Sequence, residues 1–478
     1  MDEKLVSAIV EEVLQRLSNA PSTLADKSSV VPQSASGVAT GVFEDVHDAI
    51  QAAIAAQKLW VEVKKRKRAE VISALRQSMH THAETFARMA QQETGMGRVE
   101  DKIIKHHNAA DSTPGIEDLE AKAWTGDYGL VYEDWAPYGV IAAVTPSTHP
   151  VPVLLNSIIM MIAAGNGVVF NVHPAAKKVS AYALEIFNRT IVAAGGPANL
   201  AAMVREPTME SMDILFKHPE IPLIAATGGP AVVKAAFQAG KKVIAAGPGN
   251  PPVLVDETAC LKRAAKRIID GASFDNNILC IAEKEVFVVQ KICDEFLKTM
   301  ESFGAVRLTR EQIAQLESKA FSRNECGHVV TNRAFIGKNA AVLAQQVGLS
   351  LSDDVRILFG ETEFDSSFVQ EEQMMPFLPI VRVKSAADGI VLAAKAEHGF
   401  KHTAMIYSNN LDVITQFNKV LDTDIVVVNG ASLAGNGGYS GEAYFSHTIA
   451  SPTGEGICTP RNFARIRRLA LYKNLQMF

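Results

Sequence analysis

The chain has 478 residues, of which 47% are hydrophobic and 7% aromatic, and its formal net charge is −5. This length predicts roughly two or three α/β domains around a large aliphatic core. The acidic balance argues against a nucleic-acid-binding surface, which needs a basic field. The five cysteines are widely spaced. We therefore expect no disulfide framework and no metal site, and we expect a reducing compartment.

The longest apolar run covers residues 151–164 and is interrupted by Asn156 and Ser157. It is shorter than the roughly 18–20 residues that span a bilayer, so we interpret it as a buried helix and expect no membrane association. The N-terminus begins with acidic residues and lacks a continuous apolar segment, which argues against a secretory signal.

Residues 1–18 have the pattern of a short amphipathic helix. Aliphatic side chains recur at helical spacing, at Leu5, Val6, Ile9, Val10, Val13, Leu14 and Leu17. Residues 19–41 are rich in Ser, Ala and Pro and have no periodicity, which predicts a flexible linker. A helix tethered in this way has no domain to pack on, so its apolar stripe predicts a docking peptide. The alternative is an extra helix that folds back on the body.

Short apolar runs alternate with longer amphipathic ones through the body of the chain. Helices are predicted over 46–59 and 65–94. Strands at 139–144, 168–172, 221–227 and 243–246 then alternate with helices at 151–164, 176–193 and 231–239. This alternation predicts an α/β fold with a parallel sheet covered on both faces. A second set begins with a strand at 285–290 and a helix at 291–302.

Cys280 lies in the segment Ser273-Phe-Asp-Asn-Asn-Ile-Leu-Cys280-Ile-Ala-Glu-Lys284, directly before a predicted strand. A thiol at the end of a small polar run can be presented to a cleft, where its thiolate adds to a carbonyl carbon. A lone cysteine is otherwise most often a small buried hydrophobe. The other cysteines lack such flanks and are interpreted as structural, namely Cys260, Cys293, Cys326 and Cys458.

The run Thr227-Gly228-Gly229-Pro230 lies at a predicted strand-to-helix junction. Glycines there let a pyrophosphate approach the N–H groups of the first helical turn, where the helix dipole favours an anion. A complete G-x-G-x-x-G motif is missing, and such glycines often serve only tight packing. A dinucleotide site and a packing turn therefore both remain open.

The Cys280 segment and the stretch Ala245-Ala-Gly-Pro-Gly-Asn-Pro-Pro-Val253 together resemble the aldehyde dehydrogenase superfamily, and specifically its CoA-acylating branch. The run Pro452-Thr-Gly-Glu-Gly456 matches as well, and the resemblance covers nearly all of residues 42–475. In the hydrolytic branch, the segment matching 245–247 carries a glutamate that activates water. Here it has no carboxylate, which implies that the CoA thiol finishes the reaction.

The resemblance implies the aldehyde dehydrogenase fold, with a Rossmann-like cofactor domain, an α/β catalytic domain and an oligomerisation element. We assign 42–250 to the NAD- and CoA-binding domain, including an oligomerisation hairpin at 126–138. Residues 251–430 are assigned to the catalytic domain. Residues 431–478 return to the cofactor domain and end in an oligomerisation tail.

The family's functional residues carry over to named positions. Cys280 matches the nucleophile, and its backbone N–H matches one oxyanion donor. Thr148, in Pro146-Ser-Thr-His-Pro150, stands where the family has a side-chain amide as second donor, although this segment is also a helix-initiating turn. Glu372 matches the glutamate that binds the nicotinamide ribose. The alternative is a surface acidic pair with Glu371.

Cofactor contacts follow in the same way. Thr227, Gly228 and Gly229 lie where the superfamily holds its dinucleotide. Asn171 or His173 replaces a lysine that hydrolytic members place on the adenosine ribose. Selectivity between NAD and NADP therefore stays open.

Two further stretches, 93–102 and 173–180, resemble the acetaldehyde and propionaldehyde dehydrogenases of bacterial microcompartments. Those enzymes also carry an N-terminal helix and linker. The resemblance implies a short-chain aldehyde as substrate, NAD and CoA as cosubstrates, and a homodimer or homotetramer. It also implies that residues 1–17 dock on a shell protein, inside the lumen of a microcompartment.

Phe274, Ile278 and Leu279 near the nucleophile favour an aldehyde of two or three carbons. Three alternatives remain. A hydrolytic aldehyde dehydrogenase is disfavoured by Ala245-Ala246-Gly247. A reductase of acyl phosphates shares the fold and the cysteine but fits the motifs less well. A non-enzymatic scaffold of the compartment is suggested only by residues 1–17.

Overall fold

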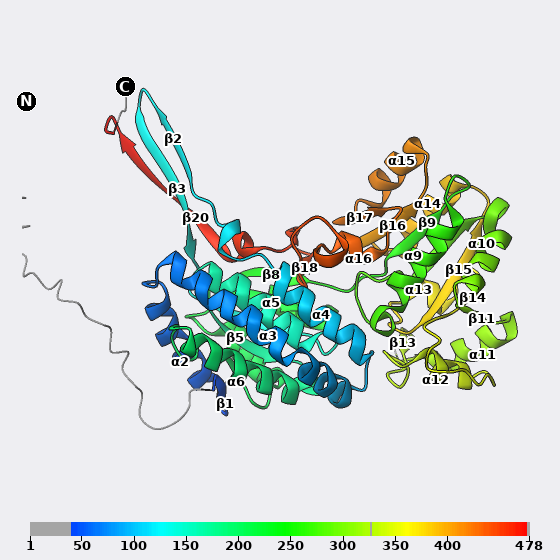
Figure 1. The fold of residues 1–478 in the computed structure, drawn as a ribbon, viewed down its shortest axis with the longest axis horizontal. Coiled ribbons are helices and arrows are strands. Elements are labelled where there is room, and N and C mark those ends of the chain that lie inside the picture. Colours follow the sequence, from blue (N-terminus) through cyan, green and yellow to red (C-terminus); the bar gives the residue numbers. More distant parts are fainter. Residues whose placement is uncertain (1–39, 326, 476–478) are drawn as a thin grey trace, which may run out of the picture. The chain divides into compact units, whose positions relative to one another are not determined.

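The structure is a computed structural model that describes residues 40–325 and 327–475 (Figure 1). The predicted targeting helix, 1–18, lies outside the described residues, as do nearly all of the predicted linker, 19–41, and Cys326. Within the described part of the chain, no helix has both the length and the apolar character that crossing a membrane requires.

The first sheet has six strands, and all neighbouring strands are parallel. Their order is β1 (Val42–Phe43), β6 (Ala201–Val204), β5 (Gly167–Val172), β4 (Val140–Thr145), β7 (Leu223–Thr227) and β8 (Lys242–Ala246). Every residue of β4 and β5 is buried, as expected for a parallel sheet covered on both faces. The strand order reverses direction between β4 and β7, and ligands of open α/β sheets bind at such a switch point.

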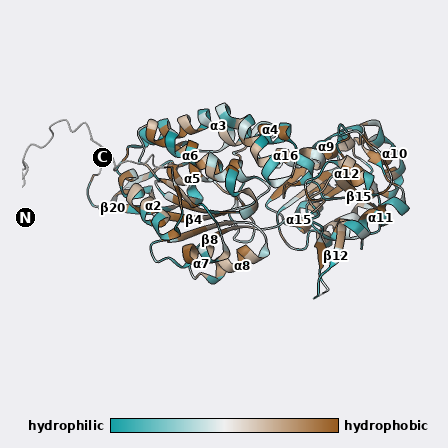
Figure 2. Ribbon diagram, turned by 90° about the horizontal axis from the view of Figure 1, so that it is seen from below, coloured by the Kyte–Doolittle hydropathy of each residue, from teal (hydrophilic) through white to brown (hydrophobic). Residues whose placement is uncertain are grey.

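Helices cover both faces of this sheet, as Figure 2 shows from below. One layer consists of α3 (Lys65–Thr94), α5 (Pro150–Ala163) and α6 (Lys177–Ala193), and the other of α2 (Val46–Trp60), α7 (Met209–Lys217) and α8 (Pro230–Gln238). All residues of α5 are buried, so the longest apolar run of the sequence is a buried helix, as predicted. The predicted helices and strands of this region are confirmed, with ends that shift by one or two residues.

The second sheet has seven parallel strands. Their order is β11 (Val306–Arg307), β14 (Leu358–Glu361), β15 (Phe377–Val383), β10 (Glu285–Val289), β9 (Pro252–Val255), β16 (Thr403–Tyr407) and β17 (Ile425–Val428). Helices α9 (Leu261–Ser273) and α10 (Gln290–Ser302) pack on one face, and α14 (Ala386–Ala396) and α15 (Leu411–Leu421) on the other. The α/β fold class is thereby confirmed. The functional division into 42–250, 251–430 and 431–478 stays a prediction.

Shorter elements complete the described part of the chain. They are α4 (Val99–Ser112), α11 (Arg310–Ala320), α12 (Ala340–Gln345), α13 (Ser367–Gln370) and α16 (Ser432–Gly435), with the pairs β12 (Phe321–Arg323) and β13 (Val329–Thr331), and β18 (Ile449–Ala450) and β19 (Gly456–Ile457). The sequence patterns did not predict α4, which becomes important at the site.

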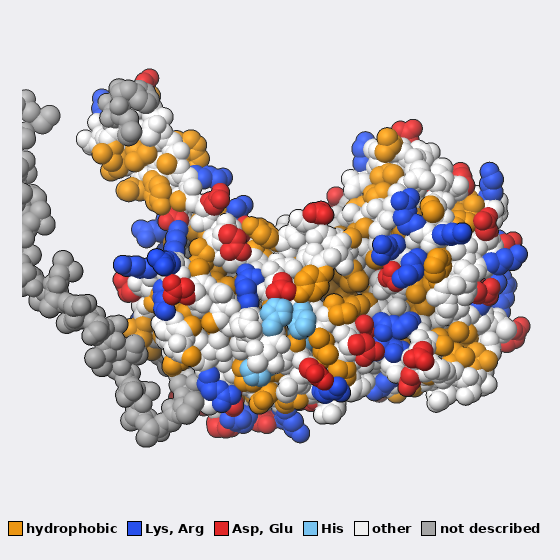
Figure 3. Space-filling model, in the orientation of Figure 1, with side chains coloured by type: hydrophobic (Ala, Val, Ile, Leu, Met, Phe, Trp, Pro, Cys, Tyr) orange, Lys and Arg blue, Asp and Glu red, His pale blue; other side chains and the backbone are white. Residues whose placement is uncertain are grey.

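A three-stranded antiparallel sheet extends away from the two larger sheets (Figure 1). It joins β2 (Lys122–Gly126), β3 (Gly129–Pro137) and β20 (Ala464–Tyr472). The hairpin therefore begins earlier than the predicted 126–138, because all residues of β2 are exposed and give no alternating pattern. Strand β20 pairs with β3 along all nine of its residues. Apolar side chains remain exposed on this sheet, as the space-filling view shows (Figure 3), among them Trp124, Tyr128, Ile466, Leu469 and Tyr472.

Asn166 fastens this antiparallel sheet to the first parallel sheet. Its fully buried amide accepts hydrogen bonds from the N–H groups of Tyr138 at 2.7 Å and Gly139 at 3.1 Å. The same amide donates to the carbonyls of Met161 at 3.1 Å and Phe463 at 2.8 Å. One side chain thus satisfies backbone groups at the ends of α5, β3 and the segment before β20.

Asn166→Ala should destabilise the protein by about 3 kcal/mol, because it leaves several buried backbone groups without partners. The measurement is the denaturant midpoint followed by circular dichroism. Asn418→Ala, at an exposed position of α15, is the control and should leave the midpoint near that of the wild type. Equal midpoints for all three proteins would contradict this role of Asn166.

Candidate active site

The backbone before Cys280 adopts an unusual conformation. Asp275, Asn276 and Asn277 have φ angles of +48°, +55° and +66°. Asp and Asn tolerate this left-handed region better than other residues that carry a Cβ. The chain leaves α9 at Ser273, passes through these three residues and reaches Cys280 just before β10. The Asp-Asn-Asn sequence is therefore matched to the turn that presents the thiol.

Asp275 anchors this turn to α4. Its buried carboxylate accepts hydrogen bonds from Lys102 Nζ at 3.1 Å, from Lys105 Nζ, and from the backbone N–H of Arg98 at 2.7 Å. Its own N–H donates to Asp101 Oδ2 at 2.8 Å. Although burial opposes ionisation, the two lysines hold the pKa of Asp275 below its ordinary value. A buried ion cluster therefore fixes the start of the turn.

The two asparagines have anchors of their own. Asn276 Oδ1 accepts from Arg98 Nε at 3.0 Å, and its Nδ2 donates to the carbonyl of Gly337 at 2.9 Å. Asn277 Nδ2 donates to the carbonyl of Ala272 at 2.8 Å. Each residue of the left-handed stretch is thus held by separate contacts, and the position of Cys280 is determined on several sides.

Two opposite charges act on the thiol. Burial raises the pKa of the Cys280 thiol to about 12, Glu372 adds to the rise, and Lys284 opposes it. Burial also raises the pKa of Glu372 to about 7, again with Lys284 opposing. The structure thus brings Glu372, predicted from the sequence as the ribose ligand, close to Cys280. Since the thiol is protonated at neutral pH in this arrangement, its reaction needs a proton acceptor.

Gly249 allows the backbone to pass very close to the nucleophile. A Cβ at this position would lie 2.7 Å from the carbonyl oxygen of Cys280 and 3.0 Å from Cγ of His402. The following Asn250 is buried, and its Nδ2 donates to the carbonyls of Val369 and Ala396, each at 2.9 Å. The Gly-Pro-Gly-Asn-Pro-Pro run therefore connects β8 to β9 while packing directly against Cys280.

His402 is a site residue that the sequence did not reveal. It is buried at the start of β16 and lies across Gly249 from Cys280. Its Nδ1 contacts Thr403 Oγ1 at 2.8 Å, whereas its Nε2 has no hydrogen-bond partner among the described residues. Burial, with a contribution from Lys284, lowers the pKa of His402 to about 4. The ring is thus neutral, with one nitrogen available. A lone histidine before a strand carries no motif that would have identified it.

Residues 245–247, which carry no carboxylate, contact the run Pro452-Thr-Gly-Glu-Gly456. Ala246 ends β8 and is buried. The N–H of Ala245 donates to Thr453 Oγ1 at 3.1 Å, and a Cβ on Gly247 would lie 2.9 Å from Cγ of Pro452. The runs 245–247 and 452–456 therefore form one wall together.

The predicted dinucleotide turn lies at the switch point of the first sheet. Thr227 ends β7, and Gly228 and Gly229 lead into α8. A Cβ on Gly229 would meet no atom within 4 Å, so the protein's own packing does not require glycine there. Thr148 follows the neighbouring strand β4, is half-buried, and accepts a hydrogen bond from Lys105 through its carbonyl at 3.5 Å. Its hydroxyl as an oxyanion donor stays a prediction.

The two candidates for the adenosine ribose have different surroundings. Asn171 is buried, and its amide accepts from Ser211 Oγ at 2.7 Å and donates to the carbonyl of Thr208 at 3.4 Å. His173 is exposed and uses Nδ1 to accept from the N–H of Ala175 at 3.1 Å. The side chain of Asn171 is therefore occupied by the start of α7, which favours His173. The role of either residue at the adenosine ribose stays a prediction.

Lys105 links the turn before Cys280 to the Pro146–Pro150 turn, a contact that the sequence patterns did not predict. Besides Asp275, its Nζ contacts His149 Nδ1 at 2.8 Å. The His149 ring stacks on that of His447, with centroids 5.3 Å apart. Burial lowers the pKa of Lys105 to about 8 against the opposing effect of Asp275.

In residues 40–325 and 327–475, no three His, Cys, Asp or Glu side chains converge as a metal site.

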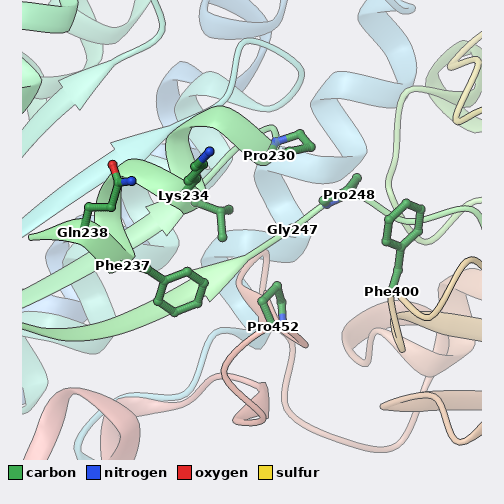
Figure 4. A pocket seen from close by; sticks show the side chains of 9 residues that line it. Pro230, Lys234, Phe237, Gln238, Gly247, Pro248, Phe400 and Pro452 are labelled. Carbon is green, nitrogen blue, oxygen red and sulfur yellow. The ribbon is translucent and has the colours of Figure 1, made fainter. Parts of the chain in front are cut away.

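A cavity of about 410 Å³ lies beside α8 (Figure 4). Phe237 and Lys234 of α8 line one side, and Gly247, Pro248, Phe400 and Pro452 line the others. Two of these lining segments continue to Gly249 and His402, next to Cys280. The cavity thus adjoins residues 245–247, which carry no carboxylate. Ile278 and Leu279, predicted from the sequence to favour a small aldehyde, are instead buried in the core of the second sheet. Their side chains therefore serve packing.

Open α/β sheets bind dinucleotides at the kind of switch point where Thr227, Gly228 and Gly229 lie, and Cys280 lies on a turn that is held from several sides. The family model described as "Aldehyde dehydrogenase family" matches residues 25–312. The chain belongs to the aldehyde dehydrogenase family, as the sequence motifs predicted.

Several known proteins are similar over nearly the whole chain. Acetaldehyde dehydrogenase (acetylating) EutE of Escherichia coli K12 is 45% identical over 473 residues, 98% of each chain. Propanal dehydrogenase (CoA-propanoylating) of Citrobacter freundii is 41% identical, covering 92% of this chain and 95% of that one.

Two solved structures are also similar. A propionaldehyde dehydrogenase from the Clostridium phytofermentans fucose utilisation bacterial microcompartment has a TM-score of 0.89 at 44% identity, covering 92% of this chain and 100% of that one. The Rhodopseudomonas palustris propionaldehyde dehydrogenase with bound CoA and an acylated cysteine has a TM-score of 0.89 at 40% identity, with the same coverage.

Gly249→Ala should lower kcat/KM by about 100-fold or more, because the new methyl group displaces the carbonyl of Cys280 and misplaces the nucleophile. Gly126→Ala is the matched control, since a Cβ there would meet nothing within 4 Å, and it should keep wild-type activity. Steady-state NADH production measures both variants. Full activity of the Gly249 variant would show that the close approach does not matter for the reaction.

Proposed function

We propose that the protein is a CoA-acylating dehydrogenase of short-chain aldehydes, which converts aldehyde, NAD⁺ and CoA into acyl-CoA, NADH and a proton. The observation that carries this proposal is the position of Cys280 on a turn held from several sides and packed against the backbone of Gly249, with no carboxylate in the nearby run 245–247. The printed names of the acylating relatives support it, as does a relative solved with CoA and an acylated cysteine.

The chemistry begins at the sulfur of Cys280. The thiolate attacks the aldehyde carbon and forms a thiohemiacetal, whose oxyanion is stabilised by the N–H of Cys280 and the hydroxyl of Thr148. Of the two titratable neighbours, Glu372, with its pKa raised to about 7 by burial, is the stronger base, and His402, with its pKa lowered to about 4, is the weaker, so Glu372 is our candidate acceptor for the thiol proton. A bound nicotinamide supplies the hydride acceptor. The resulting thioester is attacked by the CoA thiol, which exchanges one thioester for another and releases Cys280.

The residues present fit a dinucleotide. The open space at Gly229 and the start of α8 suit a pyrophosphate, and Glu372 lies near the thiol, where a nicotinamide ribose must be held. The cavity beside α8 offers the faces of Phe237 and Phe400 for a nucleotide base and the ammonium of Lys234 for a phosphate. We therefore assign this side of the site to the nucleotide cosubstrates.

Withholding CoA tests the proposed reaction directly. With aldehyde and NAD⁺ alone, the wild type should release at most about one NADH per active site and then stop, because the cysteine thioester is not hydrolysed efficiently. Cys280→Ala should give no burst, whereas Cys293→Ala should behave as the wild type. Rapid-mixing absorbance at the NADH wavelength measures the burst.

Continued turnover without CoA would show instead that water attacks the thioester, as in the hydrolytic alternative. A normal burst from Cys280→Ala would remove the proposed nucleophile.

We propose in addition that residues 1–17 are an encapsulation peptide that binds a microcompartment shell protein. Their aliphatic stripe supports this, as does the microcompartment origin of one structural relative. We propose a homodimer or homotetramer as well, for which the exposed apolar side chains of β2, β3 and β20 offer a surface for a second copy.

Deleting residues 1–18 should leave kcat and KM unchanged but abolish co-purification with shells. An isolated helix of this length is marginal in water and orders on binding. Fusing residues 1–18 to a fluorescent protein should carry that protein into compartments, and a fusion with Leu5, Ile9 and Val13 changed to Ser is the matched control. If the unaltered fusion gives diffuse fluorescence and the truncated enzyme is still encapsulated, residues 1–17 are not the encapsulation peptide.

A further inference from the structure

Lys284, four residues after Cys280, is a completely buried cation. Its Nζ donates to the carbonyl of Asn277 at 2.7 Å, to Asn277 Oδ1 at 2.6 Å and to the carbonyl of Leu279 at 3.1 Å. These acceptors belong to the turn that ends at Cys280. All three ammonium donors are therefore spent on the backbone and side chain of the residues that carry the nucleophile.

The charge of Lys284 is not neutralised by a contact. Among residues 40–325 and 327–475, Lys102 and Lys105 form ion pairs with Asp275, whereas Lys284 forms none within 4.0 Å. Burying an ammonium beside neutral acceptors alone is costly. Burial accordingly lowers the pKa of Lys284 to about 8.

The titratable groups that face Lys284 come from several elements. Glu372 and Cys280 act on it most strongly, followed by Glu285 and Glu283, and His402 is influenced by it in turn. Glu283 accepts from the N–H of Ser432 at 2.8 Å and from Ser432 Oγ at 2.8 Å. Its carboxylate is therefore engaged by α16. Glu285 is buried, neither of its carboxylate oxygens has a hydrogen-bond partner among the described residues, and burial raises its pKa while Lys284 opposes the rise. Cys280, Glu372 and Glu285 are thus the groups that respond to the ammonium.

We propose that Lys284 is a positioning residue of the reaction, which fixes the turn at 277–279 and supplies the positive charge that stabilises the thiolate of Cys280. The proposal rests on the assignment of Cys280 as the nucleophile. When the thiol loses its proton, the buried site gains a negative charge among the carboxyl groups of Glu372, Glu285 and Glu283. The ammonium of Lys284 compensates it, because none of its charge is used in an ion pair with a carboxylate.

The test is the rate at which iodoacetamide alkylates Cys280, followed as a function of pH in the full chain and assigned by mass spectrometry. Lys284→Gln keeps N–H donors for the turn but removes the charge, Lys284→Met removes both, and Lys284→Arg keeps the charge. In the Gln and Met variants we expect the alkylation midpoint to rise by about one pH unit or more. This corresponds to roughly tenfold slower labelling at neutral pH. The Arg variant should stay near the wild-type midpoint.

A folded Lys284→Gln protein with the wild-type midpoint would overturn the proposal and leave Lys284 a purely structural residue. If Lys284→Met does not fold, Lys284→Gln still decides the question, because it retains donors to the turn. Activity of Cys280→Ala separates the two levels of the argument. Retained turnover in that variant would refute the proposed function, whereas the alkylation midpoint reports on Lys284 independently of turnover.

Discussion

The buried ion cluster of Asp275 with Lys102 and Lys105 is the interaction on which the rest of the site depends. It joins the left-handed turn before Cys280 to α4, a helix more than 150 residues earlier in the chain. Removing one partner of such a buried pair leaves an uncompensated charge and typically costs about 3–5 kcal/mol. Lys105 also contacts His149. This contact keeps the turn before Cys280 and the Pro146–Pro150 turn at a fixed separation. The proposed oxyanion donor Thr148 lies on that second turn, so the same contact also holds it relative to Cys280.

The charges nearest the thiol follow a different rule. Lys102 and Lys105 of α4 are neutralised by Asp275, whereas Lys284 donates only to neutral acceptors. Glu372 raises the pKa of the Cys280 thiol, and Lys284 lowers it. Burial brings the pKa of Glu372 to about 7, so its charge changes in the physiological range. Protonation of Glu372 removes a negative charge beside Cys280 and favours the thiolate, while ionisation of Glu372 disfavours it. The two groups therefore titrate as a coupled pair, and a ligand that binds the carboxylate also alters the reactivity of the cysteine.

Sequence patterns were sufficient where apolar residues define the buried face. The helix over 65–94 and the strand over 168–172 were predicted in this way. Helix α4 was missed because its buried positions include Asp101, Lys102 and Lys105, which a hydrophobic pattern counts as exposed. The cluster around Asp275 was missed with it. Cys280 was identified through its motif, and Lys284 belongs to that motif. The role of Lys284 became visible only once its three acceptors were known, because spacing alone does not show where an ammonium points.

Residues 245–247, which carry no carboxylate, are held in place by their packing against the run 452–456. Gly247 packs against Pro452, and Ala245 is bound by Thr453. A side chain on Gly247 would therefore collide with the Pro-Thr-Gly-Glu-Gly loop unless that loop moved. The space beside this wall belongs to the cavity lined by Phe237 and Phe400, which we assign to the nucleotide cosubstrates. In the proposed reaction, the choice of CoA over water therefore depends on how 245–247 and 452–456 pack together, as well as on the missing carboxylate at 245–247.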